Sequence, residues 1–197
     1  MKVSYRALEE RDIPAAIELW KDRMAEGYPD RLLLQNSADG VEGYVASVAV
    51  SDGDIVGFAG GHVGTFANIV AVPYEHIEPT CEWEPLEQVG YFAILCVKKA
   101  YESRGIGTKL ASNLLSALSQ YQPQVMTQVW HRTTQDGGDV VESLGFEQVY
   151  TSSEYWRYAT AGYDECPECN SSPCECTGTL FVRDTSKEDT TNDDGSS

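Results

Sequence analysis

The chain has 197 residues, enough for one domain with appendages, and its hydrophobic share of 42% is ordinary for a globular protein. Its charge is unusual, because 31 acidic residues face 14 basic ones and the net charge is -17. Such a surface repels nucleic acid and anionic membranes, so we expect neither as a partner. It would suit the salt-rich cytosol of a halophile, where screening removes self-repulsion, but an acidic mesophilic protein explains the composition equally well.

The first twenty residues lack the continuous apolar run of a signal peptide, and no stretch approaches the roughly 20 apolar residues of a membrane span. We therefore expect a cytoplasmic protein. Val3, Tyr5 and Ala7 alternate with polar residues, which predicts a strand. Asp12 can cap the helix that follows, with Pro14 in its first turn.

Residues 31–35 are predicted as a short second helix, and residues 43–50 and 54–63 as two strands. Ser51-Asp52-Gly53 between these strands is a hairpin signal.

The stretch from 68 to 88 contains three prolines and is longer than a usual hairpin link. It is either an insertion that covers a functional site or an irregular surface loop. His76 and Cys81 could bind a metal there, but nothing nearby completes a ligand set.

The most informative stretch is residues 91–121, YFAILCVKKAYESRGIGTKLASNLLSALSQY. Its apolar start, residues 91–97, predicts a buried strand with Cys96 in the core, and leucines at helical spacing follow Gly105-Ile106-Gly107. A strand that ends in a glycine turn and opens a helix is typical of phosphate binding. The first helical amides lack internal partners, and glycine has no Cβ to keep a ligand away. The alternative is a plain β–α turn that needs a positive φ.

The string VKKAYESRGIGTKL resembles motif A of the GNAT superfamily, the acyl-CoA N-acyltransferases, which reads roughly V-x-P-x-Y-[RQ]-x-x-G-x-[GA]-x-x-L. The matching positions are Val97, Tyr101, Gly105, Gly107 and Leu110. Lys99 replaces the common proline. Glu102 replaces the usual Arg or Gln, which puts a carboxylate close to the expected pyrophosphate, and Arg104 is the candidate to supply positive charge.

The resemblance implies an α/β fold over residues 1–158, with a twisted mixed sheet and helices on both faces. In that fold the central strand splays from its neighbour, acetyl-CoA lies in the gap, and free strand amides stabilise the oxyanion that forms on the thioester. The residues implied to bind the cofactor are Leu95, Val97, Ser103, Arg104, Gly105, Ile106, Gly107 and Thr108.

Residues 125–130 are predicted as a strand, residues 138–144 as a helix that stops at Gly145, and a final strand pair is expected through Tyr150 and residues 155–158. The string VVESLGFEQV resembles motif B of the same family. Val141 stands where the family often has a tyrosine that protonates the leaving thiolate or contacts the sulfur. The general acid is therefore unassigned by resemblance.

The family's reaction is direct attack of an amine on the thioester, which needs a neutral amine and often a base. The candidate catalytic residues are Glu87 and Tyr91, near the start of the central strand, and His131, at the end of the next one. Histidine has the ordinary pKa best suited to a base, although a satisfied surface histidine is the alternative. Tyr28, Arg31 and Gln35 either line the acceptor pocket or belong to an irregular surface loop.

Four of the six cysteines fall within eleven residues, at Cys166, Cys169, Cys174 and Cys176. Cys-x-x-Cys spacing suits a tetrahedral ion, and zinc fits an intracellular protein better than two disulfides do. Four thiolates would make the site closed and structural; free or redox-active thiols are the alternative. We expect a zinc knuckle over residues 159–183, with residues 180–182 anchoring it on the sheet, and a disordered acidic tail over residues 184–197.

Two functions follow from these features. The first is an N-acetyltransferase, a monomer or homodimer, that moves an acetyl group from acetyl-CoA to the primary amine of a small molecule or peptide. The second is a non-catalytic acyl-CoA sensor, or a zinc-knuckle interaction module, on a GNAT fold.

Overall fold

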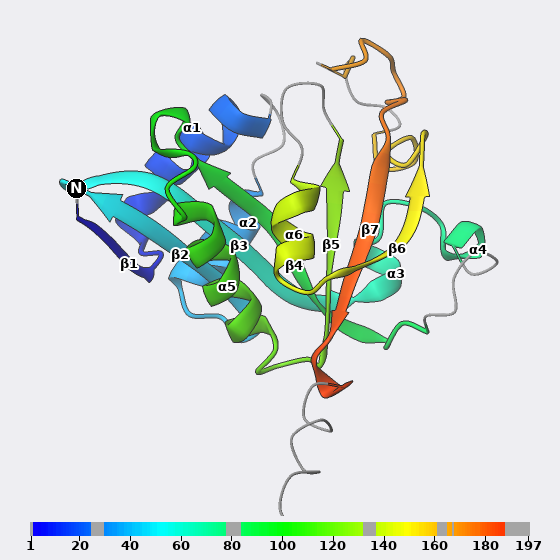
Figure 1. Ribbon diagram of the computed structural model, residues 1–197, viewed down its shortest axis with the longest axis horizontal. Coiled ribbons are helices and arrows are strands. Elements are labelled where there is room, and N and C mark those ends of the chain that lie inside the picture. The colour runs from blue at the N-terminus through cyan, green and yellow to red at the C-terminus, as the bar shows by residue number, and fades with distance from the viewer. Residues whose placement is uncertain are drawn as a thin grey trace, which may run out of the picture. The chain divides into compact units, whose positions relative to one another are not determined.

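The computed structural model describes residues 2–24, 30–77, 84–131, 137–160, 165–166 and 168–187. The predicted α/β architecture is confirmed: seven strands form one mixed sheet in the order β1-β2-β3-β4-β5-β7-β6 (Figure 1). The strands are β1 Val3–Ala7, β2 Tyr44–Ser51, β3 Asp54–Thr65, β4 Gln88–Val97, β5 Gln124–Trp130, β6 Glu147–Ser152 and β7 Gly178–Asp184. The helices are α1 Ile13–Met24, α2 Arg31–Ala38, α3 Phe66–Ile69, α4 Tyr74–Ile77, α5 Ile106–Leu118 and α6 Gly138–Ser143.

The chain divides into two compact units, residues 1–63 with 92–121 and residues 64–91 with 122–197. Strands β3 and β4 run through both units. None of the helices among the described residues is both long and apolar enough to cross a membrane.

In the first unit, β1, β2 and β3 form an antiparallel meander with the predicted hairpin turn between β2 and β3. Helices α1 and α2 pack on one face of these strands through a core that includes Trp20, Leu33 and Phe58. Helix α5 packs on the other face, where a Cβ added at Gly57 would meet Leu110 at 3.1 Å (Figure 1). The apolar stripe predicted for residues 106–118 therefore faces the sheet.

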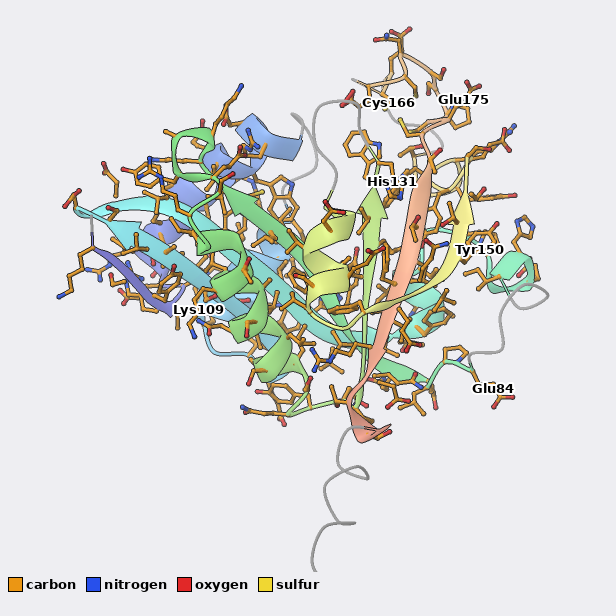
Figure 2. The ribbon with its side chains drawn as sticks, viewed as in Figure 1. Glu84, Lys109, His131, Tyr150, Cys166 and Glu175 are labelled. Carbon is orange, nitrogen blue, oxygen red and sulfur yellow. The ribbon has the colours of Figure 1, made fainter. Side chains whose placement is uncertain are left out.

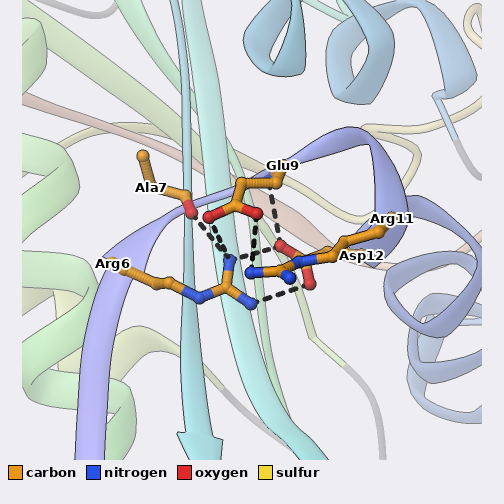
Figure 3. Close-up of polar contacts among 5 residues, drawn as sticks. All are labelled: Arg6, Ala7, Glu9, Arg11 and Asp12. Atoms are coloured by element: carbon orange, nitrogen blue, oxygen red, sulfur yellow. Dashed lines mark hydrogen bonds and ion pairs between the residues drawn. The ribbon is translucent and has the colours of Figure 1, made fainter.

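Arg6 and Asp12 join β1 to the start of α1 (Figure 3). The guanidinium donates to both Asp12 carboxylate oxygens at 2.5 and 2.9 Å, and the Glu9 amide donates to Asp12 at 2.9 Å. Asp12 is therefore the third residue of a one-turn 3-10 helix, Glu10–Asp12, and its side chain caps the start of that helix. The prediction that it caps α1 itself is wrong. The bond from Arg6 holds the pKa of Asp12 below its usual value.

An Asp12→Asn variant should lose about 1–3 kcal/mol of unfolding free energy at neutral pH, because Asp12 is 5% exposed and its carboxylate is paired with Arg6. The lowered pKa means that this stability is present above the unfolded value of about 3.9 and is lost as pH falls through the lower folded value. Urea unfolding at pH 7 and pH 3 should show the difference between wild type and variant shrinking at the acid end. Glu10→Gln, on an exposed neighbour, is the control. Equal stability of wild type and Asp12→Asn at pH 7 would contradict the prediction.

In the second unit, β7 lies between β5 and β6 and is antiparallel to both. Its centre is the apolar run 180–182, which was expected only to anchor a knuckle on the sheet. Residues 155–158, predicted as a strand, are instead a run of turns in which Tyr155 is fully buried. That prediction failed because aromatic residues are common in strands, but here they bury their rings from a turn, and the sequence does not distinguish the two.

Residues 66–77 belong to the stretch between the hairpin and the central strand, and they form α3 and α4. Phe66, Val72 and Ile77 are buried in the core of the second unit. Of the two alternatives for this stretch, the irregular surface loop is therefore wrong for this part, and the insertion that covers a functional site stays a prediction. Residues 78–83, including Cys81, lie outside the described residues, as do Tyr28 and residues 188–197 of the expected tail.

Candidate functional site

The glycine turn between β4 and α5 is the first candidate site. The chain leaves β4, makes a 3-10 turn over Lys99–Tyr101 and enters α5 through Gly105, whose φ is +75°. Ser103 also has a positive φ, +56°, which is uncommon for a residue with a side chain. Successive turns of this kind can aim neighbouring backbone amides at one point, where an anion is favoured.

The two glycines of this turn leave room above the start of α5. A Cβ added at Gly105 would meet nothing within 4 Å. A Cβ added at Gly107 would approach only Val97 and Leu95, at 3.6 and 3.9 Å. The first helical hydrogen bond of α5 is donated by the Lys109 amide to the Gly105 carbonyl, so the amides of residues 106–108 come before the first i to i−4 bond of the helix. A helix dipole and such amides together favour a bound anion.

An ion pair neutralises the carboxylate beside this turn. Arg23 of α1 donates to Glu102, with 15% of the arginine side chain and 39% of the glutamate side chain exposed. The negative charge that the sequence places near an expected pyrophosphate is therefore offset by a partner 79 positions away. Arg104 lies over the ring of Tyr101, 5.5 Å from its centroid.

A polar network in the second unit surrounds Tyr91 of β4. Its hydroxyl oxygen accepts a hydrogen bond from Gln128 of β5 at 3.2 Å, and Tyr155 donates to the same amide group at 2.9 Å. Exposure alternates along β4, so the half-buried residues 91, 93, 95 and 97 share one face of the strand. Tyr91 thus lies on the face that carries Leu95 and Val97.

Glu87 and His131 lie near opposite ends of β5. Glu87 is exposed, and its carbonyl accepts a hydrogen bond from the Phe66 amide. Just before it, the Leu86 amide donates to the side chain of Gln124 at the start of β5, and that side chain donates to the Glu84 carbonyl. His131 follows the last residue of β5, and Figure 2 shows it far from Glu84. A seven-residue strand is about 20 Å long, so these two residues cannot serve one reacting atom.

The ring of His131 is hydrogen-bonded to a pair of threonine hydroxyl groups. Its Nε2 lies 2.7 Å from Thr179 Oγ1, which lies 2.7 Å from Thr151 Oγ1. Thr179 is 1% exposed, and the His131 amide donates to Thr177. These contacts favour a histidine that fixes the end of β5 against β7.

The four cysteines of residues 166–176 form the second candidate site (Figure 2 labels Cys166). Their Sγ atoms all lie within 4.8 Å of one another, and Cys166 and Cys174 are buried. No disulfide joins the cysteines that the structure describes. The cluster is compatible with a metal ion.

Backbone amides already favour thiolate at one member of this cluster. Burial opposes ionisation of Cys169, but hydrogen bonds from the Glu175 and Ser171 backbones outweigh it and lower its pKa to about 6. Burial raises the pKa of Cys174 well above its usual value and that of Cys176 to about 11. Without a cation, Cys174 and Cys176 would therefore stay protonated near neutral pH.

The model of the "Acetyltransferase (GNAT) family" matches residues 7–146, most of the chain. The chain belongs to the GNAT family. No curated protein matches its sequence. The match spans the glycine turn and the strands on either side of it.

Solved structures share the GNAT fold over nearly the whole chain. Arabidopsis thaliana NAA60 in complex with acetyl-CoA is 18% identical with a TM-score of 0.64, covering 92% of this chain and 97% of its own. The ribosomal-protein-S18-alanine N-acetyltransferase of Escherichia coli is 15% identical with a TM-score of 0.59, covering 92% and 93%. Arabidopsis thaliana Naa50 in complex with the bisubstrate analogue CoA-Ac-MVNAL is 13% identical with a TM-score of 0.59, covering 93% and 99%.

Three features of the regions described above were missed in the sequence: the Arg23–Glu102 pair, the Gln128 network and the Thr179 hydroxyl chain. Each joins residues from distant parts of the chain. Only the polar residues inside otherwise apolar strands, Gln128 and Thr179, gave a signal, because a buried polar side chain needs hydrogen-bond partners.

Proposed function

We propose that the protein transfers an acetyl group from acetyl-CoA to a primary amine by direct attack. The observation that carries this proposal is the start of α5, where Gly105 has a positive φ and a Cβ would meet nothing within 4 Å. The pyrophosphate of acetyl-CoA binds at the amides of residues 103–108, and the glycines allow it to approach the backbone. Leu95 and Val97 contribute the apolar surface beneath.

The chemistry needs no covalent enzyme intermediate. The amine nitrogen bonds to the thioester carbon, amides of β4 stabilise the oxyanion, and the carbon–sulfur bond breaks with its electron pair on sulfur. Tyr91 is the residue proposed to exchange a proton with the reacting groups. Its support is its place on the half-buried face of β4 and the hydrogen bond that its oxygen accepts from Gln128.

We propose a peptide amino terminus as the acceptor class. One structural neighbour is in complex with the bisubstrate analogue CoA-Ac-MVNAL, and another is named a ribosomal-protein-S18-alanine N-acetyltransferase. The net charge of -17 would favour basic peptides at low salt.

The test is thiol release from acetyl-CoA in the presence of an amine panel: peptides with free or blocked amino termini, lysine-containing peptides, polyamines and aminoglycosides. We expect release with free amino-terminal peptides, and mass spectrometry should place the acetyl group on the α-nitrogen. Acetyl-CoA binding without transfer to any member of the panel would refute the proposal in favour of an acyl-CoA sensor.

Arg23→Ala should weaken acetyl-CoA binding about fivefold at low salt, because Glu102 then keeps its full charge beside the bound pyrophosphate. Adding Glu102→Gln should restore the affinity. Calorimetry with wild type, both variants and Arg11→Ala, which removes one positive charge at an exposed site, measures the effect. The difference should shrink in molar salt. A double variant as weak as Arg23→Ala alone would show that Arg23 acts in another way.

We also propose that Cys166, Cys169, Cys174 and Cys176 hold a structural Zn²⁺. Four sulfurs placed tetrahedrally about 2.3 Å from zinc lie about 3.8 Å apart. The observed sulfur–sulfur distances are 3.5 Å for 166–174, 3.8 Å for 166–176 and 3.9 Å for 169–174. A disulfide would need about 2.05 Å.

Hydrogen bonds support the same assignment. The amides of Glu175 and Cys176 approach the sulfurs of Cys169 and Cys174 at 3.4 Å, an arrangement that stabilises thiolates. The Cys174 amide donates to Thr160 at 3.0 Å, which ties the cluster to the turns after β6. A bound zinc would keep the four sulfurs ionised and fix this segment to the start of β7.

A further inference from the structure

The side-chain amide of Gln128 has hydrogen bonds at all four of its positions. Its oxygen accepts from the Ala71 amide at 2.7 Å and from the Tyr155 hydroxyl at 2.9 Å. Its nitrogen donates to the Ile69 carbonyl at 3.1 Å and to the Tyr91 hydroxyl oxygen at 3.2 Å. All of these residues belong to the second unit.

The two backbone partners fix which way this amide points. The Ala71 N–H can only donate and the Ile69 carbonyl can only accept, so the oxygen must face Ala71 and the nitrogen must face Ile69. With the amide held in this way, Tyr155 must be the donor to Gln128 and Tyr91 must be the acceptor from it. The direction of every hydrogen bond in the network follows.

We propose that Gln128 is the positioning residue for Tyr91 in acetyl transfer, an inference that rests on the proposed function. A hydrogen bond donated to a phenol oxygen stabilises the phenolate and makes the hydroxyl a better proton donor. Gln128 thereby holds the ring of Tyr91 in one orientation and prepares its proton for transfer.

With Tyr91 as the proton donor, every proton that moves in the reaction is accounted for. When the carbon–sulfur bond breaks, the leaving CoA sulfur takes the Tyr91 proton. The phenolate then takes the proton that the new amide nitrogen sheds, and Tyr91 returns to its neutral form. Tyr155 shares the Gln128 amide with Tyr91. Burial, with Tyr91 and Tyr150 nearby, raises the pKa of Tyr155 far above its usual value, so Tyr155 stays a neutral donor.

The test replaces the amide by side chains of similar size. Gln128→Met should lower kcat about tenfold with little change in KM for acetyl-CoA, equivalent to the loss of about one charge-stabilising hydrogen bond. The alkaline limb of the kcat–pH profile should move up by about one unit. In a Tyr91→Phe background, the same substitution should cause no further loss of kcat.

A second readout needs no turnover. The phenolate absorbance of Tyr91, taken as the difference from Tyr91→Phe, should titrate at higher pH in Gln128→Met than in wild type. Gln128→Glu keeps the accepting oxygen but loses the amide hydrogens, and it should move the titration the same way. Tyr155→Phe is the matched control, because it removes a bond on the oxygen side and should leave the Tyr91 titration almost unchanged.

The Tyr91 titration decides the inference independently of the proposed reaction. An unchanged titration in both Gln128 variants would overturn it, as would an equal loss of kcat in the wild-type and Tyr91→Phe backgrounds. Wild-type protein that binds acetyl-CoA but acetylates no amine would refute the proposed function instead, and the titration would still show whether Gln128 acts on Tyr91.

Discussion

A Gly107→Val variant should bind acetyl-CoA at least about 100-fold more weakly than wild type, a change of about 2.7 kcal/mol. The branched side chain would occupy the space above the first turn of α5, where the pyrophosphate is proposed to sit. Gly107→Ala should have a smaller effect, because its Cβ meets only ordinary contacts with Val97 and Leu95, at 3.6 and 3.9 Å. Isothermal titration calorimetry on folded protein measures all three affinities.

The control for this series is Ser112→Val, which places the same side chain on the exposed face of the same helix. Neither substitution should cost much helix propensity, because valine is more favourable than glycine and close to serine in a helix, so a selective loss of binding cannot be assigned to helix propensity. Gly105→Val, where φ is +75°, combines strain with blockage and should also abolish binding. Wild-type affinity in a folded Gly107→Val protein would move the cofactor away from this turn.

The second large effect is expected at the cysteine cluster. Purified protein should carry one zinc per chain, and Cys174→Ser should lose it, because three thiolates leave an open and weaker site. Since zinc binding and local folding are coupled, hydrogen exchange should then speed up first at the amides of residues 165–177, with the glycine turn unaffected. Mass spectrometry of the native protein gives the metal content directly.

The matched control is Cys96→Ser, which alters a buried cysteine of β4 outside the cluster and should keep the metal. Native protein without metal, and with four cysteines that alkylate readily, would refute the zinc site. Loss of acetyl transfer on chelation, with acetyl-CoA still bound, would instead make the cluster part of the acceptor site.

Much of the fold could be predicted because it is encoded in short stretches. Alternation predicted β1, the apolar run predicted most of β4, and leucine spacing predicted α5. The place of β7 could not be predicted, since its pairing with β5 joins Val125 to Arg183, far apart in the chain. A local sequence pattern predicts that a segment is a strand, but it does not predict which strands it pairs with.

The candidate site divides in the same way. The glycine turn could be read from the sequence because its conformation depends on consecutive residues. The pair between Arg23 and Glu102, and the network that joins Gln128 to Tyr91, depend on packing between elements. The candidate catalytic residues Glu87 and His131 show where sequence reasoning stops. Each lies next to a predicted strand in the sequence, but the sequence did not show that they lie near opposite ends of β5.

The position of β7 between β5 and β6 has a consequence for protein synthesis. β6 leaves the ribosome before β7, yet β7 is the strand that links it to β5 through hydrogen bonds on both sides. Once β5 has left the ribosome, and until β7 has also emerged, β5 presents an unpaired edge that can pair with another nascent chain. The sheet of the second unit is therefore not complete until β7 has emerged. If the cluster holds zinc as proposed, a shortage of zinc would leave the cysteine segment unfolded and prolong that exposure, and newly made chains should then aggregate.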